Sequence, residues 1–120
     1  MTWAMVMIGG AIGSAVRYGV SLAMNPTAGE GLPWGTLTAN VLGCFLIGWL
    51  FVWFATSTEV SEPVRIGILV GVLGGFTTFS SFGLESIALF KAGKTGALLA
   101  YVGLSNLGGL LAVWLGMRLG

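Results

Sequence analysis

Four long apolar stretches decide what this chain can fold into. An α-helix needs about 20 residues to cross the hydrocarbon core of a bilayer, and each stretch is close to that length. The stretches cover approximately residues 2–24, 34–56, 64–90 and 95–119. Short connections containing Gly, Pro and charged residues separate them. The pattern predicts an all-α integral membrane protein in which residues 1–120 form a single transmembrane domain of four helices.

The composition limits the possible functions. Hydrophobic residues make up 56% of the sequence and charged residues only 8%, so lipid rather than water must surround most side chains. The sequence has no His and only one Cys, Cys44, which removes the usual ligands of zinc and the partners of a nucleophile. A net charge of +1 provides no basic surface for nucleic acid. We therefore expect neither an enzyme nor a nucleic-acid-binding protein.

Basic residues are nearly balanced between the two ends of the predicted helices. Arg65 and Arg118 fall on the side of the N-terminus, Lys91 and Lys94 on the other side, and Arg17 inside the first span. Orientation in a membrane follows an excess of Lys and Arg on one side. The balance therefore allows insertion in both orientations, and two copies could pair as an antiparallel dimer. A modest bias that fixes one orientation is the alternative.

Glycines recur at helical spacing. Gly9 and Gly13 lie four residues apart, as do Gly67, Gly71 and Gly75. Residues four apart share a helix face, and faces made of small residues let the backbones of two helices approach closely. These glycines predict a tightly packed bundle and no more.

The third span contains a segment that does not resemble a continuous helix. Residues 74–83 read GGFTTFSSFG, and two glycines followed by two β-branched threonines lower helix propensity. The segment predicts a break near the middle of the membrane. Irregular backbone at that depth is tolerated where protein or a wet cavity surrounds it, and broken helices often carry ion or substrate sites. A simple kink, with hydroxyls bonded to their own backbone, is the alternative.

Three segments together resemble a known family. GGFTTFSSF at 74–82 closely resembles the signature of the Fluc (CrcB) fluoride channels. GGAIGSAVRY at 9–18 and GTLTAN at 35–40, followed by Gly43, are similar to that family's first-helix and second-helix patterns. Their order and spacing and the length of the chain agree with the family over all four spans.

The resemblance implies a function and an assembly. The protein is expected to be a passive, fluoride-selective channel of the bacterial plasma (inner) membrane that exports cytoplasmic fluoride and so gives fluoride resistance. It is expected to form an antiparallel homodimer with two pores, in which the broken helices cross. A structural sodium ion at the crossing would be held by the backbone carbonyls of Gly74 and Thr77. A heterodimer with a paralogue of opposite orientation stays open.

The resemblance also implies pore residues. Phe79 and Phe82 match the family's paired phenylalanines, whose ring edges carry partial positive charge, and Asn40 would donate from its amide. From spacing alone, packing explains the two phenylalanines, and hydrogen bonding between helices explains Asn40. Hydroxyl groups would complete a polar track along the pore. They belong to Thr36, Ser81, Tyr101 and Ser105.

Several polar residues have no settled role in this interpretation. Arg17 should face protein or water because its charge is costly in a bilayer, and it lines a vestibule or extends to the interface. Glu85 either extends the polar track or pairs with a base. The family's hydroxyl track continues beyond Tyr101 and Ser105, where this chain has Gly108 and Gly109 instead, and Asn106 either compensates or joins helices.

Two other functional classes compete. A proton-coupled exporter of the small multidrug resistance type would also have four spans, but it needs an acidic residue in its first helix, and residues 2–24 contain none. A purely structural membrane protein would need no polar, broken helix. The sequence therefore favours a channel.

Overall fold

The structure is a computed structural model that describes residues 1–24 and 31–120, and all regular secondary structure in these two ranges is helical. The elements are α1 (Thr2–Met24), α2 (Trp34–Thr56), α3 (Glu62–Ile66), η1 (Gly67–Val72), α4 (Leu73–Phe76), α5 (Phe79–Lys91) and α6 (Thr95–Leu119). Four helical spans are long and apolar enough to cross a membrane. The prediction of four membrane-spanning helices with a break in the third is confirmed. Most of the predicted first connection, residues 25–30, lies outside the described residues.

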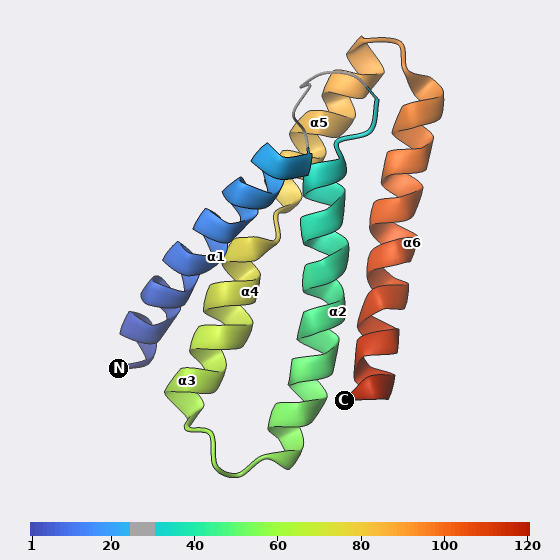
Figure 1. Ribbon diagram of the computed structural model, residues 1–120. Helices are drawn as coiled ribbons and strands as arrows, with labels where there is room; N and C mark the ends of the chain where they lie inside the picture. The colour runs from blue at the N-terminus through green and yellow to red at the C-terminus, as the bar shows by residue number, and fades with distance from the viewer. Residues whose placement is uncertain (25–30) are drawn as a thin grey trace.

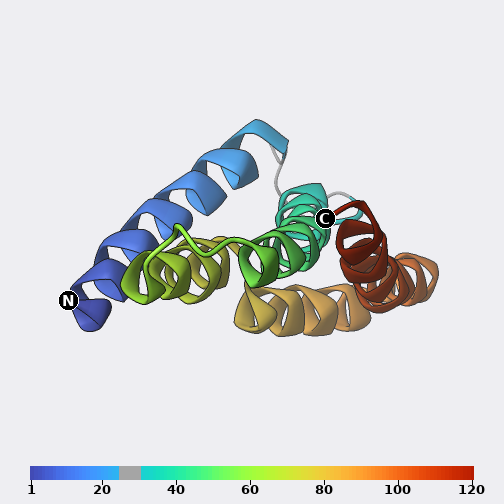
Figure 2. The ribbon, with the colours of Figure 1, turned by 90° about the horizontal axis from the view of Figure 1, so that it is seen from below.

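The helices stand side by side, and the two termini lie at the same end of the bundle (Figure 1). The helix α1 packs on η1 and α4, whereas α2 packs mainly on α6. The third span, Glu62–Lys91, is divided between two positions. Its first half stands in the row between α1 and α2, and its second half, α5, lies against one face of that row (Figure 2). The break therefore transfers the chain from the row to the face.

Glycines permit these close contacts, as their spacing predicts. A Cβ added at Gly9 would collide with the carbonyl oxygen of Gly67, and one added at Gly13 would collide with that of Val72. Between α2 and α6, a Cβ at Gly48 would collide with the backbone of Val113. The backbones are in direct contact at these points, so no side chain fits there.

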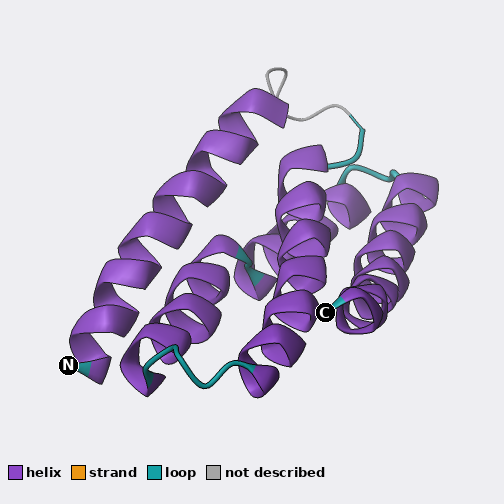
Figure 3. Cartoon of the chain, turned by 60° about the horizontal axis from the view of Figure 1, so that its bottom comes forward, coloured by secondary structure: helices purple, strands orange, loops and turns teal. Residues whose placement is uncertain are grey.

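The third span differs from the prediction in two details. The segment Gly67–Val72 is a π-helix, which the sequence did not indicate. The break is also narrower than expected, because Gly74 and Gly75 remain helical in α4 and only Thr77 and Thr78 leave the helix (Figure 3). Gly75 is needed for packing, since an added Cβ would lie 2.7 Å from the carbonyl oxygen of Gly10.

Candidate functional site

The break between α4 and α5 consists of two extended residues. Thr77 has φ −92° and ψ 158°, and Thr78 has φ −152° and ψ 126°. Each threonine satisfies a helix end. The N–H and hydroxyl of Thr77 donate to the carbonyl oxygen of Leu73 at 3.1 and 3.0 Å. The hydroxyl of Thr78 accepts the N–H of Ser81 at 3.2 Å and so caps the first turn of α5.

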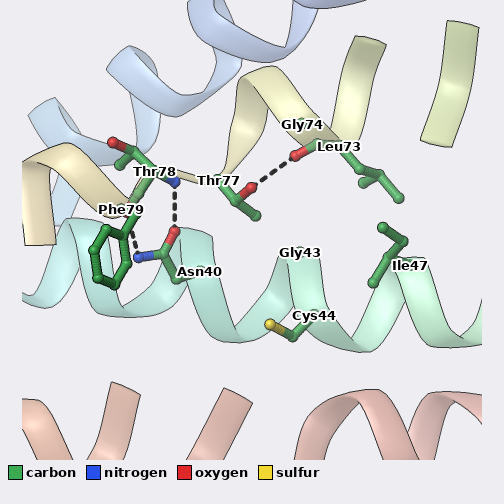
Figure 4. Close-up of a pocket in the computed structure, with 9 residues that line it drawn as sticks. All are labelled: Asn40, Gly43, Cys44, Ile47, Leu73, Gly74, Thr77, Thr78 and Phe79. Atoms are coloured by element: carbon green, nitrogen blue, oxygen red, sulfur yellow. Dashed lines mark hydrogen bonds between the residues drawn. The ribbon is translucent and has the colours of Figure 1, made fainter. Parts of the chain in front are cut away.

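Asn40 on α2 pairs with the broken backbone through both ends of its amide (Figure 4). The N–H of Thr78 donates to Oδ1 at 2.7 Å, and Nδ2 donates to the carbonyl oxygen of Thr78 at 2.9 Å. The amide thus replaces the bonds that a continuous helix would have given Thr78. An amide has two N–H donors, so one of them is left after this pairing. The hydrogen bond between helices that the sequence offered as an alternative for Asn40 is present.

Arg17 on α1 is directed to the same region. Its Nε donates to the carbonyl oxygen of Gly75 at 3.1 Å, and the side chain is half-buried. The sequence allowed Arg17 either to face protein or water inside the bundle or to extend to the membrane interface. The contact favours the first, because the guanidinium lies on the broken helix and not at the end of α1. A role in a vestibule stays a prediction.

Carbonyl groups beside the break, among them those of Gly74 and Thr77, have no hydrogen-bond donor within residues 1–24 and 31–120. In a continuous helix, Gly74 would bond the N–H of Thr78, but that N–H is turned to Asn40. Thr77 would bond the N–H of Ser81, but that N–H is held by the hydroxyl of Thr78. Gly74 is exposed, with no atom within 4 Å of an added Cβ. These carbonyls are oxygen ligands that the fold has left without a partner.

A cavity of about 290 Å³ lies between α2 and the break in the third span. It is bordered mainly by apolar groups, and its polar edge is formed by Asn40 and the two threonines of the break (Figure 4). Its lining residues are Asn40, Gly43, Cys44, Ile47, Leu73, Gly74, Thr77, Thr78 and Phe79. Gly74 and Thr77, whose carbonyl groups lack a donor, therefore line the same cavity as Phe79.

Three aromatic rings continue from the cavity toward α6. The ring centroids of Phe79 and Phe82 lie 5.6 Å apart with an interplanar angle of 43°, and those of Phe82 and Tyr101 lie 5.2 Å apart at 47°. Phe79 is 81% exposed, Phe82 is half-buried and Tyr101 is fully buried. Tilted pairs at this distance direct the positive edge of one ring toward its neighbour. The two phenylalanines therefore share one side of α5, as their spacing indicated.

The hydroxyl of Tyr101 joins α6 to two other helices. It donates to Oε1 of Glu85 at 3.3 Å and has a side-chain hydrogen bond with Thr36, which is buried on α2. The structure thus brings Thr36, Phe82 and Tyr101 together, with Glu85 beside them. Within residues 1–24 and 31–120, Glu85 has a hydroxyl and no base as its hydrogen-bond partner, which decides between the two roles considered from the sequence.

Among the described residues, the other predicted site residues have no hydrogen bond to Tyr101, Glu85 or Thr36. The Oγ of Ser105 on α6 is buried without a hydrogen-bond partner in the described part of the chain. Ser81 is half-buried and contributes its N–H to the helix cap. Asn106 is exposed and bonds the carbonyl oxygen of Val102. Thr78 was absent from the predicted site, although a Thr directly before a helix is a recognisable cap.

Comparison with known proteins identifies a matching family and individual relatives of this chain. A family model described as CrcB-like protein, Camphor Resistance (CrcB), matches residues 4–117. Proteins named fluoride-specific ion channel FluC are similar over nearly the whole chain. The one from Chloroflexus aurantiacus is 44% identical, over 96% of this chain and 91% of its own length. The one from Agrobacterium fabrum is 44% identical over 98% and 94%, and one from Thermus thermophilus is 46% identical over 97% and 91%.

Proposed function

This chain belongs to the CrcB family, a family of ion channels and not of enzymes, and from this premise we propose that it conducts fluoride passively across a membrane. The observation that carries the proposal is the broken third helix. Asn40 holds its two extended residues, and a row of aromatic rings and hydroxyl groups begins beside them. A continuous helix would keep its backbone groups bonded within itself and would leave Asn40 no extended backbone to hold.

The chemistry of fluoride fits such a lining. A small anion must exchange its hydration shell for hydrogen-bond donors and positive edges, and conduction requires that these bind it weakly enough for release. The remaining N–H of Asn40 and the hydroxyl groups of Ser81 and Ser105 are donors without full charge. The edges of Phe79 and Phe82 add partial positive charge. A Lys or Arg in the same place would hold the anion more strongly.

We propose that two copies pair in opposite orientations and that each pair has two pores. The near balance of basic residues on the two sides supports this arrangement. The break itself supports it as well, because Gly74 and the ring of Phe79 are exposed in the single chain. If the two breaks met at the centre of the pair, these groups would be covered by protein.

A sodium ion at the meeting point is part of this proposal. Hard cations prefer oxygen ligands, and the carbonyl groups of Gly74 and Thr77 lack donors within the described residues. Arg17 occupies the neighbouring carbonyl of Gly75. These two carbonyls in each copy would hold the ion, which would supply positive charge where four peptide dipoles converge.

The proposed physiology is protection of a bacterial cell from fluoride at its inner membrane. Neutral hydrogen fluoride crosses membranes and ionises in a less acidic cytoplasm, where the anion is trapped. A passive pathway lets the anion leave down its own gradient and needs no energy source.

Efflux from liposomes tests this function. Purified protein should release fluoride from loaded vesicles once a potassium ionophore dissipates the membrane potential, and vesicles without protein should not. A lack of fluoride release, or export of an organic cation driven by a proton gradient, would refute the proposal.

A further inference from the structure

Asn106 is a polar side chain in an unexpected place. It lies at the centre of α6, Thr95–Leu119, and is exposed in the single chain. Its neighbours Leu107 and Leu110 are exposed apolar residues, as expected for a surface surrounded by lipid. The middle of a spanning helix lies at the middle of the bilayer, where polar side chains are costly unless protein or water meets them.

The amide of Asn106 is only partly satisfied. Its Nδ2 donates to the carbonyl oxygen of Val102 at 2.8 Å, one turn earlier on the same helix. An amide has two donors and an oxygen with two lone pairs. One N–H and the whole of Oδ1 are therefore left without a partner in the described part of the chain. In hydrocarbon, such groups are expected to bond across to another chain.

The position of Asn106 around α6 identifies the side on which that chain would lie. Gly109 follows three residues later, and an added Cβ there would lie 3.4 Å from Sγ of Cys44. Val113 follows seven residues later and contacts Gly48 on α2. Residues three and seven apart share one side of a helix, so Asn106 lies at the edge of the contact between α2 and α6. Cys44 also lines the cavity at the break, which places Asn106 on the same side as that cavity.

The preceding residue, turned by ~100° around the helix toward the bundle, also has unused hydrogen-bonding capacity. The Oγ of Ser105 is buried without a hydrogen bond within residues 1–24 and 31–120. The side chain of Asn106 and that of Ser105 are thus adjacent polar groups with unused bonding capacity at the depth of the break.

We propose that Asn106 is a contact residue between two antiparallel copies of this chain and bonds the first turn of α5 in the second copy. This inference rests on the antiparallel pair described under the proposed function. A two-fold axis in the membrane plane through the breaks would bring the first turns of the two α5 helices together, and α5 of the second copy would then extend toward the C-terminal half of α6. The exposed hydroxyl in that turn belongs to Ser80. Asn106 then completes each polar track with a bond from the other copy.

Dimer affinity in lipid vesicles, measured by energy transfer between labelled copies, tests the contact. Asn106→Leu removes the amide and keeps a good helix former in lipid. We expect a dimer dissociation constant about tenfold higher than that of the unmodified chain, from the usual strength of hydrogen bonds between membrane helices. Leu107→Ala is the matched control, because Leu107 is 73% exposed and projects ~100° further around the helix. Its dissociation constant should change by less than about twofold.

Disulfide formation gives a second measurement that does not depend on affinity. In a Cys44→Ala background, Asn106→Cys combined with Ser80→Cys should form a covalent dimer on mild oxidation, whereas Leu107→Cys combined with Ser80→Cys should not. Unchanged affinity for Asn106→Leu, or cross-linking through position 107 and not 106, would overturn the inference.

Fluoride efflux from the same vesicles separates the two proposals. If the unmodified chain passes fluoride while Asn106→Leu dimerises normally, only the contact is refuted. If the unmodified chain passes no fluoride, the channel function is refuted and the affinity and cross-linking results still decide the contact.

Discussion

Replacing Asn40 by Leu should destabilise the protein at the break, because the bonds that it removes are all made to Thr78. The substitution removes two hydrogen bonds, of 2.7 and 2.9 Å, and leaves both backbone groups of Thr78 without their partners. An unsatisfied buried group costs about 1–3 kcal/mol, so the pair would cost about 2–6 kcal/mol if Thr78 were fully buried. Thr78 is half-buried, which places the expected loss at the lower end, about 2–3 kcal/mol.

Unfolding in mixed detergent micelles, followed by tryptophan fluorescence, measures this loss. Thr56→Val is the matched control, because it removes one exposed bond from a side chain to the carbonyl of Trp53 at the end of α2 and should cost less than about 0.5 kcal/mol. Fluoride flux should fall with Asn40→Leu, since the break loses its position. An unfolding free energy equal to that of the unmodified chain would show that the amide does not hold the break.

Three further predictions concern the pore, the packing and the cation. Phe82→Ile should abolish fluoride flux while the dimer persists in size-exclusion chromatography, because an aliphatic side chain has no positive edge; an unchanged rate would remove Phe82 from the pathway. Gly13→Ala should lower the unfolding free energy by about 1–3 kcal/mol, whereas Gly19→Ala, with no atom within 4 Å of the new methyl group, should leave it unchanged or raise it by up to about 1 kcal/mol, because Ala is the better helix former; equal effects would contradict the close contact of α1 with η1. Replacing sodium by N-methylglucamine during purification should lower flux and dimer stability, and full activity without sodium would exclude a structural cation at Gly74 and Thr77.

The helices and the existence of a break could be predicted from sequence, because both depend on local properties. Runs of apolar residues with the length of a bilayer crossing identify the spans, and GGFTT interrupts the third. The exact residues of the break depend on distant contacts. Gly75 stays helical because it packs on Gly10, and Thr78 is extended because Asn40, 38 positions earlier, takes its backbone bonds.

The π-helix and the pairing of polar side chains could not be predicted from the sequence for a related reason. A stretch such as Gly67–Val72 contains only small and apolar residues, so its side-chain pattern does not distinguish a π-helix from an α-helix. Glu85 and Tyr101 are 16 positions apart on different helices, and their pairing follows from how α5 and α6 fold back on each other. The sequence supplied the candidate groups, and tertiary packing selected which of them meet.

Electrical recording of the purified protein in a planar bilayer shows directly whether fluoride passes the broken helix. With a fluoride gradient across the bilayer, an opposed chloride gradient and equal pH on both sides, we expect a current that reverses at the equilibrium potential of fluoride. The same current should be lost in Phe82→Ile. Reversal at the equilibrium potential of chloride, or no current from protein that is folded and dimeric, would contradict a fluoride pathway at the broken helix.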